Sequence, residues 1–311
     1  MLGENIKMEG ATLRYFCELV SHVILWQAMG VKMKDAGYEN IMIMYEETFH
    51  GFTLEEHFHN CFEMIYIVDG SAQFIINEKL YEAKKNDIVF ISNLETHKIN
   101  MVSFPYKRYY ILIHPKYLSS LIGESVIASI FKHRPDDFSH IIKLNNSCSG
   151  DIDNIIRNIY EESKTKSDMW ETAVKSYFCL LFTLLYRNFK EYFPVKQTDR
   201  MSDTILNIQK YIEDRCTEDL TLDTVSKKFY IDRFYLSRLF KKITGYTFKE
   251  YIIRQRIAKA KELLYYTEKS ITEIGISSGF NNVNNFIRTF KNYEGIPPYQ
   301  YRKKSGRKFT K

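Results

Sequence analysis

The chain carries two hydrophobic patterns, one typical of β-strands and one typical of helices. Between about residues 41 and 110, short apolar runs are separated by polar turn residues. Runs of this length at this spacing predict the strands of a small β-barrel. In chain order the runs are IMIMYEE, CFEMIYIVDG, SAQFIINEKLYEA, NDIVFIS and RYYILIH.

Residues 151–193 change to helical spacing and predict two helices, with a polar turn near Lys164–Asp168. The second helix, SDMWETAVKSYFCLLFTLLYRNF, is apolar almost all round, so it must be buried on several sides. Either the barrel or a partner helix could cover it, and the pattern leaves both open. Pro194 ends this helix, and the polar residues after it predict an interdomain linker. Near the N-terminus, Leu13–Met29 could form an amphipathic helix over one end of the barrel.

The C-terminal third contains one helix-turn-helix pattern written twice. The first copy, LTLDTVSKKFYIDRFYLSRLFKKITG, runs from Leu220 to Gly245, and the second, SITEIGISSGFNNVNNFIRTFKNYEG, runs from Ser270 to Gly295. Each copy has a short scaffold helix, a tight turn and a second helix with an apolar inner face and a polar outer face. Arg238 and Arg288 occupy corresponding positions in the two copies.

Turn and cap residues place the helices of each copy. In the first copy Tyr230-Ile231 makes the turn, and Asp232 is a good N-cap residue. In the second copy Gly279 supplies the turn and Asn281 is the expected N-cap. Apolar residues expected to face inward are Leu222, Val225, Phe229, Leu236, Leu239, Phe240, Ile271, Ile274, Ile276, Phe286 and Phe290. The outer faces, which could reach base edges and phosphates, then carry Arg233, Phe234, Ser237, Arg238, Lys241, Val283, Asn284, Ile287, Arg288 and Lys291.

A long helix, FKEYIIRQRIAKAKELLYY, separates the two copies, and Thr247 can cap it. This arrangement resembles the AraC/XylS family of transcription regulators over about a third of the chain. The residues that carry the resemblance are Leu236-Ser-Arg-Leu-Phe-Lys-Lys-x-x-Gly245, Ala260-Lys-Glu-Leu-Leu264, Ile274 with Gly279-Phe280, and Gly295-Ile-Pro-Pro-Tyr-Gln-Tyr-Arg302. One departure is that Gly275 and Ile276 stand where the family often has alanine and a polar residue.

The resemblance implies two recognition helices, held on one spine, that enter successive major grooves of double-stranded promoter DNA. Arg238 and Arg288 have the guanidinium geometry to read guanine O6 and N7. The resemblance extends the base-reading set to Phe234, Ser237, Val283, Asn284 and Ile287, and we expect phosphate contacts from Lys241, Lys242 and Lys291. It also implies a homodimer, a small-molecule effector and a contact with RNA polymerase.

Charge divides along the chain in the way a DNA-binding protein requires. Residues 201–311 carry 22 Lys+Arg and 12 Asp+Glu, a net charge of +10, whereas residues 1–200 carry 22 and 26, a net of −4. A basic domain favours phosphate neutralisation, which supplies sequence-independent affinity. The tail RKKSGRKFTK adds six of these positive charges.

The cysteines and the longest apolar runs indicate a cytoplasmic protein with no membrane segment. The five cysteines are scattered, without a CxxC pair, and are typical of reduced thiols. The longest apolar stretch, Tyr177–Tyr186, is too short to cross a bilayer, and the N-terminus lacks a signal-peptide pattern.

A second motif lies within the strand-rich region. Gly51-x5-His57-x-His59-x3-Glu63-x6-Gly70 matches the first cupin motif in every spacing. The second cupin motif keeps only His97, since Asn86, Ser92 and Leu94 replace its glycine, proline and glycine. The region therefore resembles the small β-barrel sensor domains of many AraC-type regulators.

His57 and His59 lie two residues apart, so on one strand both would point to the same face. With Glu63 and His97 they could form a three-histidine, one-carboxylate site for the effector. Such a set suits a divalent Fe, Mn, Ni or Zn ion. The same side chains could instead line a pocket for a small organic ligand or have a purely structural role, and no cofactor is certain.

The 311 residues allow roughly two domains of the usual 100–200 residues each. We expect an α+β protein with a cupin-like β-barrel, a helical dimerisation segment and an all-α domain with two helix-turn-helix units. The expected boundaries are an N-terminal helical extension over 1–40, the sensor domain over 41–145, the dimerisation segment over 146–193, the linker over 194–202, the DNA-binding domain over 203–305 and the basic tail over 306–311.

The leading hypothesis is a sequence-specific transcription regulator, not an enzyme, whose barrel senses a small molecule. Two alternatives stay open: a metal-dependent cupin enzyme fused to a DNA-binding module, and a constitutive regulator whose barrel is only a dimerisation scaffold. The degraded second cupin motif argues against the enzyme.

Overall fold

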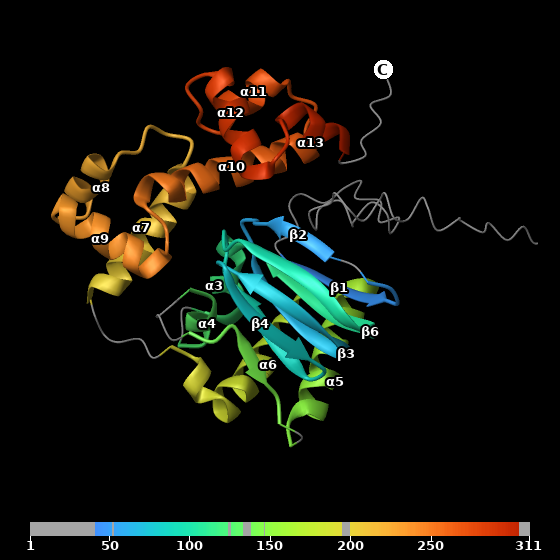
Figure 1. Cartoon of the computed structure of the whole chain (residues 1–311). Coiled ribbons are helices and arrows are strands. Elements are labelled where there is room, and N and C mark those ends of the chain that lie inside the picture. Colours follow the sequence, from blue (N-terminus) through green and yellow to red (C-terminus); the bar gives the residue numbers. More distant parts are fainter. Residues whose placement is uncertain are drawn as a thin grey trace, which may run out of the picture.

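The computed structural model describes residues 41–51, 53–123, 126–132, 138–145, 147–194 and 200–304. Figure 1 shows a strand-rich domain below a helical one. The predicted helix at Leu13–Met29 and the basic tail at 306–311 lie outside the described residues. The strands are β1 (Ile41–Thr48), β2 (Thr53–His57), β3 (Phe62–Ile76), β4 (Lys79–Lys84), β5 (Asp87–Ile91), β6 (His97–Ile113) and β7 (Ile141–Lys143).

Two long strands, β3 and β6, organise the antiparallel sheet. They pair along most of their length, and their register shifts between Ile67 and Ala72. On one side of these shifts the pair is flanked by β1 and β5, and on the other side by β2 and β4. The described strands form one seven-stranded sheet in the order β1-β6-β3-β5-β7, with β2 on β6 and β4 on β3.

Successive side chains along a strand point to opposite faces of the sheet, and each face contributes to a separate apolar core. On β3, Phe62, Met64 and Tyr66 belong to a core shared with the helices that follow the sheet. The intervening Ile65 and Ile67 belong to a second core inside the sheet. Side chains on this interior face, including Glu63, are therefore shielded from solvent by the sheet itself.

Short helical segments, absent from the predicted elements, connect the sheet to the predicted helix pair. These segments are α3 (Pro115–Ile122), η1 (Val126–Ala128) and α4 (Ser129–Lys132). The predicted pair is α5 (Ser149–Thr165) and α6 (Trp170–Asn188), followed by η2 (Lys190–Tyr192). Figure 1 shows α5 and α6 below and behind the sheet.

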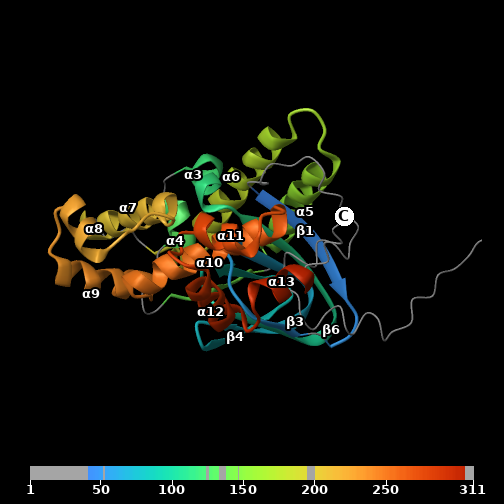
Figure 2. The ribbon, with the colours of Figure 1, turned by 90° about the horizontal axis from the view of Figure 1, so that it is seen from above.

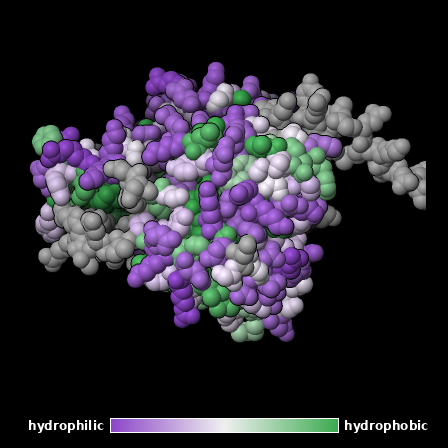
Figure 3. All heavy atoms as spheres, turned by 60° about the horizontal axis from the view of Figure 1, so that its bottom comes forward, coloured by the Kyte–Doolittle hydropathy of each residue, from purple (hydrophilic) through white to green (hydrophobic). Residues whose placement is uncertain are grey.

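Helix α6 was expected to be buried on several sides, but it is buried on one side only. Packing within the chain therefore explains the apolar residues on that side and not those on the other. Val174, Phe178, Leu181, Phe182 and Leu185 are buried against the sheet side of the domain. On the other side Leu180 is 47% exposed. Figure 3 brings the bottom of Figure 1 forward and shows a mainly hydrophilic surface with small, scattered hydrophobic groups.

The C-terminal domain is entirely helical in the described residues and is built on one long helix. Its helices are α7 (Arg200–Arg215), α8 (Leu222–Lys228), α9 (Arg233–Thr244), α10 (Phe248–Tyr266), α11 (Ile271–Ser277), α12 (Val283–Glu294) and α13 (Pro298–Lys304). Helix α7 begins at Arg200, inside the predicted linker, and residues 195–199 of that linker are outside the described residues. Figure 2 shows α7–α9 at one end of α10, and α11–α13 beside its other part, above the sheet.

The predicted spine is confirmed in its bounds and its packing. Thr247 caps α10 by accepting a hydrogen bond from the Glu250 backbone N–H at 3.2 Å. Buried side chains of α10 join one apolar core with those of both helix-turn-helix units. No helix in the described part of the chain is long and apolar enough to span a membrane.

Candidate DNA interface and sensor site

The first helix-turn-helix consists of α8 and α9. The Thr221 hydroxyl caps α8, and Tyr230 makes the turn with a positive φ of 54°. Asp232 then caps α9, accepting a hydrogen bond from the Tyr235 backbone N–H at 2.8 Å, as predicted. Leu236 and Phe240 are fully buried. The apolar inner face therefore fixes which side of α9 faces solvent.

The second unit, α11 and α12, repeats this construction with different side chains. Ser270 and Glu273 form a capping box at the start of α11. Asn282 caps α12, accepting from the Asn285 backbone N–H at 2.7 Å. The expected cap, Asn281, was wrong by one residue. Phe286 and Phe290 are buried in the core that α12 shares with the spine, where Phe286 lies against Gly275 and Phe290 against Tyr301.

Two positions in α11 depart from the sequence-based expectation. Ile276 was expected to line the inner face but is 63% exposed. Gly275 is buried against Phe286, where an added Cβ would lie 2.9 Å from the ring atom Cδ1. The unusual glycine therefore permits a close helix–helix approach, which alanine could enter only if the ring moved.

Gly279 fixes the turn between α11 and α12. Its φ is +89°, a conformation that favours glycine. A Cβ at this position would lie 2.7 Å from Thr217 Cα and 3.0 Å from the Cys216 carbonyl oxygen. The turn is thus packed tightly against the residues that directly follow α7.

The structure places most of the predicted DNA-contacting side chains on the solvent side of α9 and α12. Phe234 is 74% exposed, although it is a large apolar residue. Ser237, Val283 and Ile287 are only half-buried at the edge of the inner face. The exposed members of the set are Arg233, Phe234, Arg238, Lys241, Lys242, Asn284, Arg288 and Lys291.

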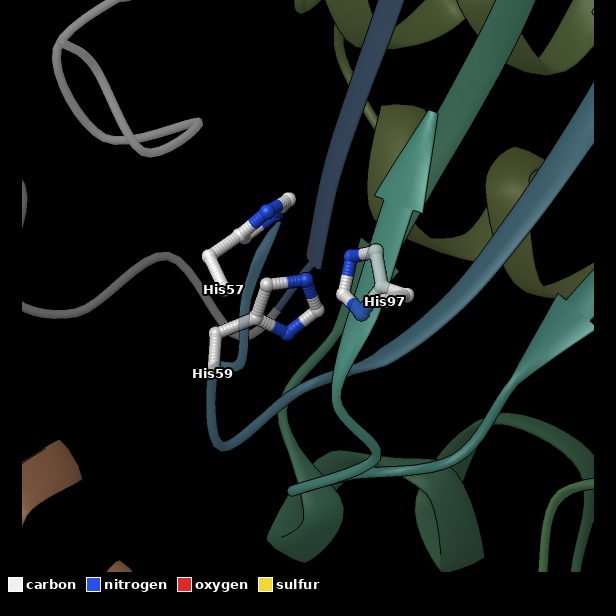
Figure 4. Close-up of side chains that lie close together, drawn as sticks. All are labelled: His57, His59 and His97. Carbon is white, nitrogen blue, oxygen red and sulfur yellow. The ribbon is translucent and has the colours of Figure 1, made fainter. Parts of the chain in front are cut away.

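The structure also brings together the four predicted sensor-site residues. One ring nitrogen from each of His57, His59 and His97 lies within 4.8 Å of the other two. Glu63 Oε2 is 3.2 Å from His59 Nε2 and 3.3 Å from His97 Nε2. Figure 4 shows the three imidazole rings converging from the end of β2, the following loop and the start of β6. Glu63 and His97 are completely buried.

The route by which His59 reaches the site differs from the one predicted. Strand β2 ends at His57, so the two histidines do not share one strand. His59 lies in the loop between β2 and β3, and its Nδ1 contacts the Cys61 carbonyl oxygen at 3.1 Å. His57 reaches the site by pairing with His97 across β2 and β6.

Backbone carbonyl groups fix the tautomer of all three rings. His57 Nδ1 lies 2.8 Å from the Glu55 carbonyl oxygen, and His97 Nδ1 lies 2.9 Å from that of Glu95. A carbonyl oxygen only accepts, so each Nδ1, including that of His59, carries the hydrogen. The neutral rings then present Nε2 lone pairs, the arrangement found in metal-binding histidines.

Burial also lowers the pKa of His59, opposed by its contact with Glu63, and this favours the neutral ring. His59 Nε2 and His97 Nε2 both lie beside the same carboxylate oxygen, Glu63 Oε2, where either a proton or a metal ion can lie between the nitrogen and oxygen atoms. A divalent metal ion fits this donor set. These four residues would hold it, and a shared proton is the alternative.

The loops that carry His59 and precede His97 also pack against the DNA-binding domain. The sequence did not indicate this contact. Phe58, between His57 and His59, is 3% exposed and belongs to the core of the helical domain. Its ring centroid lies 4.9 Å from Arg254 Cζ and 5.0 Å from Lys261 Nζ, both on α10. Lys261 Nζ also donates to the Phe58 carbonyl oxygen at 2.9 Å.

Leu94, in the loop before His97, is the second sensor-domain residue whose side chain packs into the helical domain. It is fully buried in the same helical core. Tyr246 Oη donates to its carbonyl oxygen at 2.9 Å, and Arg254 Nη1 donates to Thr96 Oγ1 at 3.0 Å. Leu94 has a positive φ of 66°, at the position where the cupin motif has glycine. The strained backbone is retained because the side chain anchors the two domains together.

Comparisons with known proteins agree with both parts of the fold. The family described as AraC-like ligand binding domain matches residues 41–168, and the family described as helix-turn-helix domain matches residues 225–304. An uncharacterized transcriptional regulator of Escherichia coli K12, YdiP, is 26% identical over 252 residues, which cover 78% of each chain. The transposon Tn10 TetD protein of Escherichia coli is 34% identical over 120 residues, covering 38% of this chain and 87% of TetD.

The chain therefore belongs to the AraC family of transcriptional regulators. It is a DNA-binding regulator with an N-terminal ligand-binding domain and a C-terminal helix-turn-helix domain. Its two-domain fold is shared by ToxT of Vibrio cholerae, which is 17% identical with a TM-score of 0.58. That match covers 86% of this chain and 99% of ToxT.

Proposed function

We propose that a ligand held by His57, His59, Glu63 and His97 controls promoter binding by this regulator. The observation that carries the proposal is the position of Phe58, which sits between two of these histidines and is buried in the core of the DNA-binding domain. A ligand that moves the histidine loop must also move or release Phe58. Ligand binding and the placement of α10 are therefore energetically coupled.

The ligand at this site is proposed to be a divalent first-row metal ion, alone or with an effector bound to it. The three Nε2 lone pairs and the Glu63 carboxylate are donors that suit Fe, Mn, Ni or Zn. Backbone carbonyl groups hold the rings in the metal-binding tautomer. The convergence of one ring nitrogen from each histidine within 4.8 Å supports this proposal.

For DNA recognition, we propose that α9 and α12 enter successive major grooves. Helix α10, which joins them, has 19 residues and so a length of about 28 Å. This is of the same order as one turn of B-DNA, about 34 Å. Arg238 and Arg288 are proposed to read bases with help from Phe234, Ser237, Val283, Asn284 and Ile287. Arg233, Lys241, Lys242 and Lys291 are proposed to contact phosphates or the groove edge, and their exposure supports this.

We further propose that the protein acts as a cytoplasmic homodimer, contacts RNA polymerase at promoters and has no enzymatic activity. The exposed Leu180 on α6 supports a dimer contact on the outer side of the helix pair. Because the two recognition helices of a monomer differ in sequence, each monomer would bind two non-identical DNA segments in one orientation. A dimer would then cover two such pairs of segments.

The proposal is tested with full-length protein purified without a metal-affinity tag. Bound duplexes selected from random-sequence DNA first define the binding site, and elemental analysis measures the metal. We expect near-stoichiometric metal, and we expect its removal by a chelator to change affinity for the selected DNA by about 5- to 150-fold, the usual range of allosteric coupling.

The double variant His57→Ala/His59→Ala should lose the metal and bind DNA equally with and without chelator. His50→Ala, which changes an exposed histidine outside the cluster, is the matched control and should behave as the parent protein. If the double variant kept its fold and its metal content, or if chelation left DNA affinity unchanged in the parent, control through this site would be excluded.

A metal-dependent cupin enzyme is the second candidate, favoured by the complete set of three histidines and one glutamate. It requires a substrate to reach the metal, whereas the loops that carry His59 and His97 are held against the helical domain by Lys261 and Tyr246. Stoichiometric metal with no effect on DNA binding would support the enzyme. An absence of metal and of any effector response would support a constitutive regulator.

A further inference from the structure

Arg108 is a completely buried cation inside the sheet. It lies on β6, and its side chain is 1% exposed. Its strand neighbours in register are Glu46 on β1 and Ile67 on β3. The rings of Tyr106 and Tyr110, two residues away on either side, lie 5.8 and 5.2 Å from Arg108 Cζ. Because side chains alternate along a strand, all three project from the same, interior face of β6.

Only two of the three nitrogen atoms of the Arg108 guanidinium group donate hydrogen bonds within the described residues. Its Nε and Nη2 donate to Glu46 Oε2 at 2.9 and 2.7 Å. Arg108 Nη1 is buried and has no acceptor among the described residues, and the same is true of the Tyr106 hydroxyl. Buried donors without acceptors are rare in folded proteins because each loses its hydrogen bonds to water.

We propose that Arg108 Nη1 and Tyr106 Oη bind the carboxylate of a small organic acid inside the sheet. This rests on the ligand-binding role of the domain and names the chemical class of its effector. The open groups are donors, so the ligand must bring acceptor oxygens. Carboxylate is the acceptor that a planar guanidinium binds best, with charge-assisted hydrogen bonds that are shorter and stronger than neutral ones.

The surroundings favour an acid with an apolar body. Ile65 and Ile67 on β3 and Tyr110 on β6 line the interior core next to Arg108. Glu63, at the histidine cluster, lies four residues from Ile67 on β3, about 13 Å along the strand. The body of an acid held at Arg108 would thus meet apolar side chains of this core.

The protonation states at this site are those that a carboxylate needs. Burial raises the pKa of Tyr106 to about 12, although the neighbouring Arg108 charge opposes this, so its hydroxyl remains a donor at neutral pH. Arg108 stays charged beside Glu46. Glu46 uses a single oxygen for both contacts, which leaves the Nη1 side of the guanidinium for a second acceptor.

The test measures thermal stability and calorimetric binding of the full chain with a defined set of acids. The set contains straight-chain monocarboxylates of four to twelve carbons, benzoate and phenylacetate, each compared with the alcohol of equal carbon skeleton. We expect at least one acid to raise Tm and its alcohol to have no effect. The variant Tyr106→Phe should bind that acid about tenfold more weakly, the usual effect of losing one hydrogen bond to a charged group.

Two further variants separate binding at this site from loss of fold. Tyr109→Phe removes a hydroxyl from the opposite, helix-facing side of β6 and should bind the acid as the parent does. Arg108→Lys keeps the charge but lacks the guanidinium fork and should bind more weakly than Tyr106→Phe. Without ligand, Tyr106→Phe should have an unchanged or higher Tm, since its hydroxyl has no protein acceptor.

The proposal is overturned if none of these acids raises the parent Tm, if the matched alcohols bind equally well, or if Tyr106→Phe binds as tightly as the parent. Metal content and DNA binding measured on the same preparations distinguish this failure from failure of the proposed function. Loss of the carboxylate site alone leaves both of those readouts unaltered.

Discussion

Lys261, on the spine helix of the DNA-binding domain, donates a hydrogen bond of 2.9 Å to the carbonyl oxygen of Phe58, a residue of the sensor domain. The Lys261 side chain is only 8% exposed and also pairs with Glu294 on α12 at 3.0 Å. One buried ammonium group therefore connects the histidine loop, the spine and the second recognition helix. The raised pKa of Lys261, to which Glu294 contributes against the effect of burial, keeps this group charged.

Replacing Phe58 by alanine should uncouple the sensor from the DNA-binding domain. The substitution removes the side chain that fills the helical core beside Arg254 and Lys261. We expect DNA affinity to become independent of metal and effector, together with a loss of stability of up to roughly 3–5 kcal/mol. Phe49→Ala, at a site that is 61% exposed, is the control. A variant that still responded to chelator as the parent does would show that coupling runs elsewhere.

Arg238→Ala and Arg288→Ala should each weaken binding to the selected DNA by about 1–3 kcal/mol and relax specificity at one position of the site. Both arginines are exposed on recognition helices, so the fold should be unaffected. Arg187→Ala, which removes an exposed arginine from α6, controls for the loss of one positive charge. Base reading would be ruled out if specific and non-specific DNA affinities fell by the same factor.

The lysines should act differently, through the salt dependence of binding. Lys241→Ala, Lys242→Ala or Lys291→Ala should weaken binding to all sequences alike and reduce the slope of log affinity against log salt by about 1. Lys175→Ala on α6 is the control for charge. Titrations at several salt concentrations measure the slope, and an unchanged slope in all three variants would remove these lysines from the phosphate contacts.

The helix-turn-helix units could be predicted because their signals are local. Caps, turn residues and inward-facing aromatic residues lie within about a dozen positions of one another, and they fix each helix without reference to the rest of the chain. The one-residue error at Asn281 and Asn282 has the same origin. Two adjacent asparagines are equally good caps, and only the tertiary packing of Phe286 and Phe290 chooses between them.

The sensor site was predicted in composition but not in its surroundings. The spacing of His57, His59 and Glu63 indicated that they would converge, although the route of His59 through a loop was not foreseen. Nothing local indicated that Phe58 or Leu94 would be buried by helices more than 150 positions later in the chain. Leu94 was noted only as a departure from the cupin motif, and its role depends on contacts that form after both domains have folded.

Gly279→Ala should destabilise the DNA-binding domain by at least roughly 1–3 kcal/mol, because the left-handed backbone and the contact with Thr217 Cα both oppose a side chain. Gly150→Ala on α5 is the matched control. A Cβ there meets nothing within 4 Å, and alanine favours the helix. Thermal unfolding of the two variants tests this, and equal melting temperatures would contradict the packing of the turn.

The interface between the domains should also respond to pH through Glu213. Its carboxyl group accepts hydrogen bonds from Asn93 at 3.3 Å, on the sensor side, and from Tyr251 at 3.1 Å, on α10. Burial raises its pKa, and the adjacent Asp214 adds to the shift, while these two hydrogen bonds and the more distant Lys132 oppose it.

A carboxyl whose pKa is raised by folding contributes stability below its unfolded pKa and loses it as pH rises toward the folded value. Glu213→Gln removes the buried charge and keeps an acceptor for Asn93 and Tyr251. We therefore expect this variant to melt at a higher temperature than the parent near pH 7.5, with the difference shrinking as pH falls toward 4. Asp214→Asn weakens the exposed ion pair with Lys116 and removes a charge that raises the pKa of Glu213, and it should cost no more than about 1 kcal/mol. The opposite result would be a melting temperature of Glu213→Gln that rises relative to that of the parent as the pH falls. It would show that Glu213 is ionised and stabilising in the folded protein.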